Sequence, residues 1–398
     1  MLSKEENEFL TRVGPGTPAG ALLRRYWQPV AVASELTAEK PKKRLKVMGE
    51  ELVLFRDGKG RYGLVGEHCS HRAASLYYGT VEDDGIRCAY HGWKYDVDGK
   101  CLEQPFEPKG STYKDEICHP AYPVEKLAGL LFAYMGPKLV PLLPRWDLLV
   151  RDDGLRTIIV LPVHECNWLQ AMENSVDPVH TYYLHGHQFK VRGLPVAEYY
   201  YRPIGEFQFE EVRGPVWAGL IKRRTFEAGE QMEGERGHPL IFPNMLYVPQ
   251  GPELVIHWRV PIDDSNTYIV WLSFRPSKNG QKVEQPEDPP VEYLPRPVTP
   301  EGEYEMTSFP GQDMMAWETQ GRIFDRTKES LAHSDKGITI YRRLLREQIK
   351  AVQNGGEPLG IIRDPANNKI ISFEVSRGMA RKEYVEGQPE YYHGRSVA

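Results

Sequence analysis

The spacing of apolar and polar residues changes character several times along the chain. Residues 3–12 and 22–27 have the pattern of two short helices, and Ser3 with Glu6 three positions later forms a capping-box pattern. From Pro29 onwards, short strand-like runs follow one another and are cut by turn signals such as Asp57-Gly58. The pattern therefore predicts a helical N-terminal segment followed by an antiparallel β module.

Gly136-Pro137 and the proline-rich residues 138–146 mark a boundary, after which strands and helices both appear. The segment 278–304, rich in Pro and Glu, is expected to be an extended linker or arm. The strands expected beyond the boundary are 157–163, 194–201, 207–212, 239–248, 254–260 and 266–274. The helical stretches expected there are 165–185 and 312–347.

This order predicts an α+β protein, with an antiparallel β domain followed by a domain in which helices cover the concave side of one curved antiparallel sheet. We expect an N-terminal helical segment over residues 1–28, the β domain over 29–140 and a catalytic domain over 141–398.

The charge and the cysteine content of the chain limit the class of protein to which it can belong. The chain has 398 residues with 50 Lys plus Arg against 55 Asp plus Glu, a formal net charge of −5, and this balance argues against a nucleic-acid partner. Five scattered cysteines do not form a disulfide framework, so a reducing cytoplasm is expected. The start of the chain lacks the features of a signal peptide, and no apolar run is long enough to span a membrane.

Two Cys-His pairs form the clearest candidate metal site. Cys69 and His71 lie in one short stretch, and Cys88 and His91 lie in another. Thiolates and imidazoles at this spacing fit a structural zinc ion or a two-iron cluster in which the cysteines bind one iron and the histidines the other. Zinc modules usually pair Cys with Cys and His with His, whereas the interleaved order found here favours the iron cluster.

These two stretches resemble the cluster-binding boxes of the Rieske ring-hydroxylating oxygenases. The matching residues are Cys69-Ser-His71-Arg72 and Cys88-Ala-Tyr-His91-Gly-Trp93. The opening residues 6–30, the stretch 90–101 and the run 165–175 are most similar to the phthalate dioxygenase branch, which includes aromatic-acid dioxygenases, hydroxylases and aryl O-demethylases. The resemblance implies a Rieske [2Fe–2S] cluster held by the two Cys-His pairs and a second site with mononuclear Fe(II).

A second group of metal-binding residues lies between positions 177 and 187. Asp177 precedes a proline, a suitable start for a helix, and His180 would share a helical face with it. His180 and His185 are roughly 140° apart on a regular helix, so the helix has to loosen or end near His185 if both are to bind one ion. His187 would come closer to that face if the helix continued.

The resemblance assigns this stretch to the mononuclear iron. Asp177, His180 and His185 match the D-x2-H-x4-H motif of the family, in which the two histidines bind iron and the aspartate links it to the cluster of a neighbouring subunit. Asp313, in the segment 312–321, matches the carboxylate ligand that completes the facial triad, with Glu318 as its competitor.

Several other residues are candidates for functional roles, with weaker support from the sequence. Arg72 and Trp93 are expected beside the cluster, and several basic residues of the second domain are candidate cations for an acidic substrate: Arg202, Lys222, Arg223, Arg224 and Arg259. Structural roles are expected for Cys101, Cys118, Cys166 and His164.

The resemblance implies the terminal oxygenase component of a Rieske oxygenase system, acting on an aromatic, carboxylated substrate by ring dihydroxylation or monooxygenation. The alternative within the family is O-demethylation of a methoxy-aromatic acid with release of formaldehyde. A separate NAD(P)H-dependent reductase, with or without a ferredoxin domain, is expected because the chain has no G-x-G-x-x-G fingerprint. The resemblance also implies that the protein assembles as a homotrimer or hexamer. A Rieske electron carrier and a zinc-stabilised binding module remain the alternatives outside the family.

Overall fold

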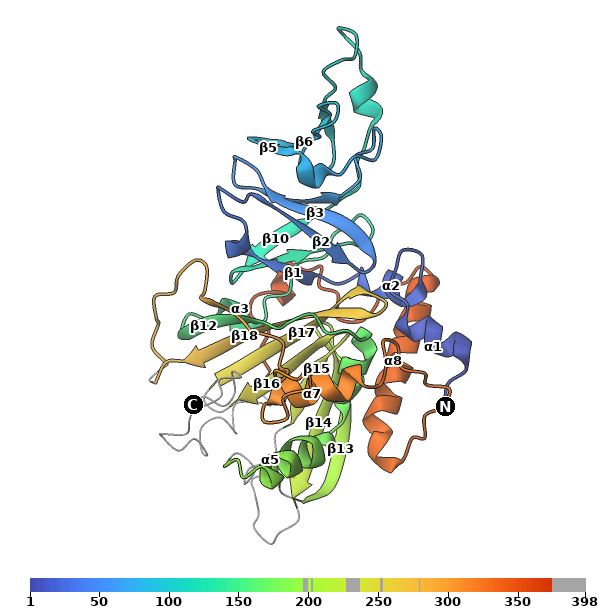
Figure 1. The fold of residues 1–398 in the computed structure, drawn as a ribbon, viewed down its shortest axis with the longest axis vertical. Coiled ribbons are helices and arrows are strands. Elements are labelled where there is room, and N and C mark those ends of the chain that lie inside the picture. Colours follow the sequence, from blue (N-terminus) through green and yellow to red (C-terminus); the bar gives the residue numbers. More distant parts are fainter. Residues whose placement is uncertain (196–199, 202, 227–236, 251–252, 279, 374–398) are drawn as a thin grey trace.

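The N-terminal part of the computed structural model is built from three small antiparallel sheets (Figure 1). The structure describes residues 1–195, 200–201, 203–226, 237–250, 253–278 and 280–373. The first sheet has the strand order β1-β11-β10, the second β2-β3-β4-β9 and the third β5-β6-β7-β8. The strands are β1 (Gln28–Val32), β2 (Lys42–Val47), β3 (Glu50–Arg56), β4 (Tyr62–Gly66), β5 (Thr80–Glu82), β6 (Gly85–Arg87), β7 (Lys94–Tyr95), β8 (Cys101–Glu103), β9 (Ala121–Tyr122), β10 (Val124–Leu127) and β11 (Leu130–Ala133).

Strand β3 connects two hydrophobic cores. Leu52 and Leu54 belong to the large core that extends through most of the chain, whereas Val53 and Phe55 belong to a small core that also contains Cys69 and Cys88. Successive side chains of a strand point to opposite faces, so one strand serves both cores. The loops that carry the two cysteines are thereby anchored to the rest of the protein.

An eight-stranded sheet dominates the C-terminal part, with the order β13-β14-β15-β16-β17-β18-β12-β19. Neighbouring strands are antiparallel except for the β12–β19 pair. The strands are β12 (Gly154–Val160), β13 (Ile204–Arg213), β14 (Ala218–Phe226), β15 (His238–Ile241), β16 (Met245–Gln250), β17 (Glu253–Asp263), β18 (Asn266–Pro276) and β19 (Val291–Tyr293). With the helices that pack on this sheet, the α+β class predicted from the sequence is confirmed.

Several elements differ from the sequence prediction. The expected strand 239–248 is a hairpin, β15 and β16, because the chain turns at Phe242-Pro243-Asn244. The expected linker 278–304 contributes the parallel edge strand β19. Strand β14 was not predicted. Leu194, Pro195, Tyr200 and Tyr201 are not in a strand, and 196–199, the centre of the strand expected at 194–201, lies outside the described residues.

The helices also differ in their bounds. Helix α1 (Lys4–Thr11) has the predicted capping box between Ser3 and Glu6, but the second helix, α2 (Pro18–Leu23), begins earlier than expected because Pro18 occupies its first turn. The helical stretch 312–347 divides into α7 (Phe309–Glu318) and α8 (Lys336–Gln353). Three other α-helices with described bounds are α3 (Asp147–Val150), α4 (Trp168–Val176) and α5 (Gln188–Val191).

Short 3-10 helices occur in the connections: η1 (Ala33–Glu35), η2 (Leu76–Tyr78), η3 (Tyr113–Glu116), η5 (His333–Asp335) and η6 (Pro365–Asn367). A search of the described residues for a membrane-spanning helix finds none with the length and apolar character required.

Candidate metal centres

The two Cys-His stretches fold into loops with the same backbone geometry. In the first loop, Ala73 N–H donates to Cys69 O at 2.8 Å; in the second, Gly92 N–H donates to Cys88 O at 3.0 Å. Ala73 and Gly92, each four residues after its cysteine, have positive φ angles of 57° and 74°. Two such equivalent turns suit two loops closing on one cluster.

The two cysteines and the two histidines of these loops differ in their exposure to solvent. Cys69 and Cys88 are each 3% exposed, whereas His71 is exposed and His91 half-buried at the surface. The imidazole rings of His71 and His91 lie 4.6 Å apart between centroids. Burial raises the pKa of the Cys69 thiol, so a buried thiolate here needs the positive charge of bound metal. The donor set fits a two-iron cluster with a thiolate side inside and an imidazole side at the surface.

Residues around these loops hold them in place. Trp93 stacks on His71 with ring centroids 4.5 Å apart, and the Tyr95 hydroxyl lies 3.2 Å from Cys69 Sγ. His119 stacks on Tyr95 and bonds Ser70 Oγ and Gly66 O, both at 2.8 Å. Trp93 was expected near the cluster, but Tyr95 and His119 were not. Only the position of Tyr95 two residues after Trp93 could have pointed to it.

The second group of candidates is brought together by a π-helix, η4 (Thr181–His187), which follows α4 after a short break. In a π-helix the hydrogen bonds join residues five apart. His180 and His185 therefore approach each other, with ring centroids 5.3 Å apart, which a regular α-helix would prevent. The loosening of the helix that the sequence required is present.

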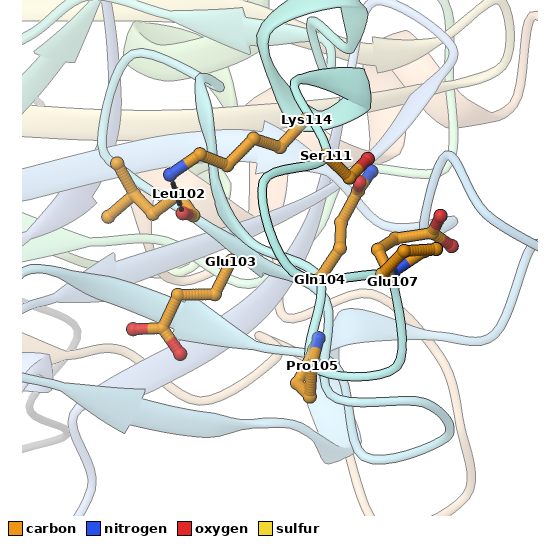
Figure 2. Close-up of a pocket in the computed structure, with 8 residues that line it drawn as sticks. Leu102, Glu103, Gln104, Pro105, Glu107, Ser111 and Lys114 are labelled. Carbon is orange, nitrogen blue, oxygen red and sulfur yellow. Dashed lines mark hydrogen bonds between the residues drawn. The ribbon is translucent and has the colours of Figure 1, made fainter.

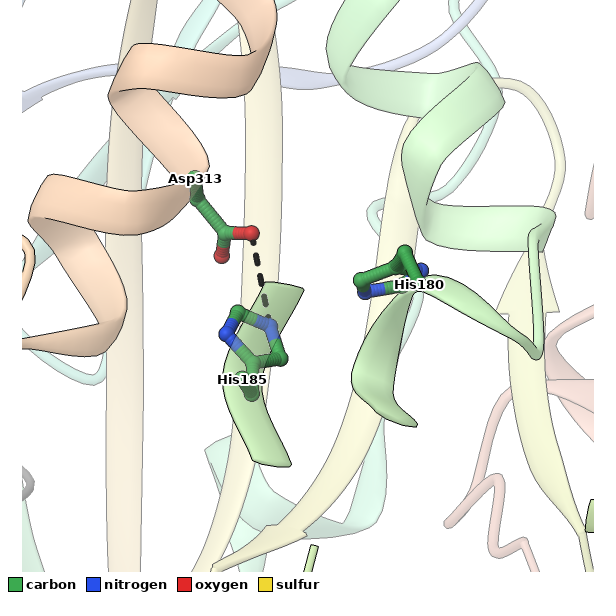
Figure 3. A group of neighbouring side chains, drawn as sticks. All are labelled: His180, His185 and Asp313. Atoms are coloured by element: carbon green, nitrogen blue, oxygen red, sulfur yellow. Dashed lines mark ion pairs between the residues drawn. The ribbon is translucent and has the colours of Figure 1, made fainter. Parts of the chain in front are cut away.

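Asp313, from α7, completes this group (Figure 3). One candidate ligand atom from each of His180, His185 and Asp313 lies within 4.8 Å of the others. Asp313 Oδ1 lies 3.5 Å from His185 Nε2 and is buried without a hydrogen-bond partner among the described residues. Buried polar atoms are normally paired, so an unpaired carboxylate oxygen beside two imidazoles fits a divalent metal ion.

A glutamine orients His185. Gln312 Nε2 donates to Met306 O at 2.8 Å, which leaves its Oε1 to accept from His185 Nδ1 at 2.7 Å. This bond places the His185 proton on Nδ1 and frees the Nε2 lone pair toward Asp313. Burial lowers the pKa of His185 to about 4, so the ring is neutral and able to bind metal at pH 7. The sequence analysis assigned Gln312 no role.

Asp177 lies on the other side of His180. Its carboxylate accepts from the backbone N–H groups of Val179 at 2.8 Å and His180 at 3.1 Å, and its Oδ2 lies 3.3 Å from His180 Nδ1. Burial alone would raise the pKa of Asp177, but the contacts with His180 and the Val179 N–H outweigh it and lower that pKa. Asp177 is therefore an ionised group directly beside a candidate ligand.

Glu318 and His187, the alternative candidates for iron ligands, make contacts elsewhere. Glu318 binds Arg296, accepts from Tyr304 Oη at 2.9 Å and accepts from Glu165 N at 2.8 Å. His187 contacts the rings of Tyr183 and Tyr201. Neither residue is in the group with His180 and His185.

The residue next to His185, Gly186, has to be a glycine for a steric reason. A Cβ at this position would lie 2.5 Å from the backbone nitrogen of Tyr201, so only glycine permits the close approach of the two segments.

A surface hollow of about 280 Å³ lies in the loop after β8 (Figure 2). Lys114 Nζ donates to Leu102 O across it at 3.0 Å. It is lined by Leu102, Glu103, Gln104, Pro105, Glu107, Pro108, Ser111 and Lys114. None of these residues belongs to either candidate centre.

The chain is similar to known proteins over most of its length. Residues 26–122 match the Rieske [2Fe-2S] domain, and residues 293–385 match the family described as LigXa C-terminal domain like. The chain is 40% identical to the 5,5'-dehydrodivanillate O-demethylase oxygenase subunit of Sphingobium sp., with 97% of this chain and 91% of the relative covered. It is 32% identical to the phthalate 4,5-dioxygenase oxygenase subunit of Pseudomonas putida, with 96% and 95% covered.

The fold is similar to that of the terminal oxygenase of carbazole 1,9a-dioxygenase from Nocardioides aromaticivorans, with a TM-score of 0.62 at 20% identity and coverage of 87% of this chain and 98% of that one. The cofactors are therefore those of the family, a Rieske [2Fe–2S] cluster and a mononuclear non-haem iron. The chain belongs to the Rieske non-haem iron oxygenases, as a terminal oxygenase subunit of the branch that includes the phthalate dioxygenases and aryl O-demethylases.

Proposed function

We propose that Cys69, His71, Cys88 and His91 bind the Rieske cluster and that His180, His185 and Asp313 bind the mononuclear iron. The observation that carries the proposal is the approach of one atom from each of the last three residues to within 4.8 Å, from two segments more than 120 positions apart. An iron held there supplies O₂ activation with electrons delivered through the cluster. The protein orients His185 through Gln312 and keeps Asp177 ionised beside His180.

We infer that electrons pass between subunits. The β5–β6 region, which leads into the second cluster loop, and helix α5, which follows the π-helix, lie toward opposite ends of the molecule (Figure 1). A head-to-tail ring would bring the cluster of one subunit to the iron of the next. Asp177 is then the bridging acid, in a homotrimer or a hexamer built from two trimers. A separate NAD(P)H-dependent reductase, with or without a ferredoxin domain, supplies the electrons.

The substrate of the proposed reaction is an aromatic carboxylic acid, hydroxylated on the ring by dihydroxylation or monooxygenation. O-demethylation of a methoxy-aromatic acid is the second candidate, and the 40% identity to an O-demethylase oxygenase subunit supports it. In that reaction hydroxylation of the methyl group gives a hemiacetal, which separates into a phenol and formaldehyde.

The test is product analysis under ¹⁸O₂. Purified protein, a surrogate reductase and NADH would be incubated with phthalate, 3-methoxybenzoate, 4-phenoxybenzoate and 5,5'-dehydrodivanillate. A product diol with two labelled oxygen atoms indicates ring dihydroxylation, and formaldehyde with the corresponding phenol indicates O-demethylation. Absence of any oxygenated product with a fully loaded, reducible protein would contradict the proposed substrate class.

A further inference from the structure

Three neighbouring buried side chains, two of them on strand β17 of the large sheet, have nitrogen atoms without hydrogen-bond partners. His164, His257 and Arg259 are 0%, 6% and 4% exposed. Among the described residues, both ring nitrogens of each histidine and the Nε and Nη1 atoms of Arg259 have no partner. Buried polar groups are normally paired, so a concentration of unpaired donors needs an explanation.

This cluster lies beside α7, the helix that carries Asp313. Arg259 Cζ lies 5.8 Å from the centroid of the Trp317 ring, and the His164 and Trp317 centroids are 5.1 Å apart. Trp317 follows Asp313 by four residues and so shares a face of α7 with it. His257 stacks on Trp271 at 4.3 Å. The unpaired donors are thus close to the candidate iron centre and have aromatic rings beside them.

Arg259 is the group in this cluster that carries a charge at neutral pH. Burial lowers the pKa of Arg259 to about 10, so its guanidinium remains protonated. Burial lowers the pKa of His164 to about 3 and that of His257 well below its usual value, so both rings are neutral. The carboxylate whose charge acts on Arg259 is Asp313.

A metal ion at Asp313 would take up the charge of that carboxylate. Arg259 would then be a buried cation with no neutralising partner, an arrangement that costs several kcal/mol unless an anion is supplied. The cluster therefore lacks one negative group when the iron centre is loaded.

The other basic side chains named in the sequence analysis have different contacts. Lys222 Nζ donates to Ser175 O at 2.7 Å and to Asp177 O at 3.0 Å, and Arg224 donates to Thr181 Oγ1. Arg223 pairs with Glu210 at 2.8 Å near the surface. Arg202 lies outside the described residues.

We propose that Arg259 binds the carboxylate group of the aromatic substrate and thereby orients its ring toward the iron. A guanidinium presents paired N–H donors that match the two oxygens of a carboxylate. Trp317 and Trp271 supply apolar surface for the ring, and His164 and His257 supply further polar contacts. The inference rests on the proposed function, since it names the group of the substrate that the protein recognises.

The experiment compares wild type with Arg259→Gln, Arg259→Lys and the control Arg223→Gln. Binding to the iron-loaded, reduced protein without O₂ is measured by calorimetry. The probes are phthalate, 3-methoxybenzoate, 4-phenoxybenzoate and 5,5'-dehydrodivanillate, each beside its uncharged amide. Wild type is expected to bind at least one acid about 100-fold more tightly than the amide, because a desolvated charge pair is broken in the amide complex.

Arg259→Gln is expected to abolish this preference, Arg259→Lys to retain part of it, and Arg223→Gln to leave it unchanged. The proposal is overturned if the wild-type protein binds no acid of the panel, or if it binds acids and amides equally tightly. Oxygenated products formed equally well from acids and amides would overturn it while leaving the proposed oxygenase function intact.

Melting temperature separates recognition from a structural role. Removing an uncompensated buried charge should leave the ligand-free protein as stable as wild type or more stable. If Arg259→Gln lowers the melting temperature and weakens the binding of acids and amides to the same extent, Arg259 is a structural residue and the proposal fails.

Discussion

The Nδ1 atom of His185 lies 2.7 Å from Oε1 of Gln312, and this contact joins the π-helix to α7. Gln312 precedes Asp313, so the residue that orients one candidate ligand is the chain neighbour of another. Because the Gln312 amide is itself fixed by Met306 O, the orientation of the His185 ring is set by α7 and the segment before it.

Gln312→Leu should weaken iron binding. The variant removes the acceptor that fixes the His185 tautomer, and the loss of such an outer contact typically costs 10- to 100-fold in metal affinity. Iron is measured by metal analysis after dialysis against a chelator, with the visible spectrum reporting the cluster separately. Gln320→Leu, at an exposed position of the same segment, is the control. Equal iron retention in both variants would contradict the role of Gln312.

Asp313→Ala and Glu318→Ala should separate the two candidate carboxylates. Asp313→Ala is expected to lose the mononuclear iron and keep the cluster, because its carboxylate lies in the group with the two histidines. Glu318→Ala is expected to keep the iron and lose stability, because it breaks the contacts with Arg296 and Tyr304. Iron content and melting temperature measure both effects. Loss of iron from the Glu318 variant alone would reverse the assignment.

Asp177→Asn should uncouple the two metal centres. The amide still accepts a backbone N–H bond from Val179, so the fold and both metals should remain. The negative charge beside His180 is lost, and with it the proposed link to the cluster of the next subunit. The expected result is normal reduction of the cluster by the reductase with product formation reduced by at least about 100-fold, a size typical of a lost positioned group. Rapid-mixing spectroscopy and product analysis measure the two steps, and normal product formation would refute the link.

Tyr95→Phe should lower the reduction potential of the cluster. The Tyr95 hydroxyl lies 3.2 Å from Cys69 Sγ, and hydrogen bonds to cluster sulfurs favour the reduced state. A bond to a charged group is worth about 1.5–3 kcal/mol, which for a one-electron couple corresponds to a downward shift of about 65–130 mV. Redox titration followed by visible spectroscopy gives the potential. Tyr122→Phe, whose hydroxyl instead contacts Glu50, should leave it unchanged.

The sequence predicted local features much better than contacts between distant segments. Cys69, His71, Cys88 and His91 lie within 23 positions, and the spacing of His180 and His185 correctly required a distorted helix. Gln312 and His119 were missed because their roles depend on contacts across 127 and 49 positions. The hairpin of β15 and β16 was read as one strand because both of its strands are apolar and only Phe242-Pro243-Asn244 separates them. Propensity and spacing do not report which distant surfaces meet.

Arg342→Gln should destabilise the fold far more than Arg343→Gln at the next position of α8. Arg342 is 3% exposed and pairs with Glu173 at 2.6 Å and with Glu329 at 2.6 Å, and Arg326 also pairs with Glu173. Breaking a buried pair leaves an uncompensated charge and typically costs about 3–5 kcal/mol, whereas an exposed pair contributes about 1 kcal/mol or less. Arg343 is exposed, so its loss should be minor. Urea unfolding at pH 7 measures the difference.

The same network should make stability depend on acid pH. Burial would raise the pKa of Glu173, but the charges and hydrogen bonds of Arg326 and Arg342 outweigh it, and the pKa is lowered. A carboxyl with a lowered folded-state pKa contributes stability above its unfolded pKa, about 4.3, and loses that contribution as pH falls through the folded value. The gap between wild type and Arg342→Gln should therefore be constant from pH 6 to 8 and narrow below about pH 4. A gap that stays constant down to pH 3 would show that Glu173 is not the ionised partner, because its protonation would then leave the contribution of Arg342 unchanged.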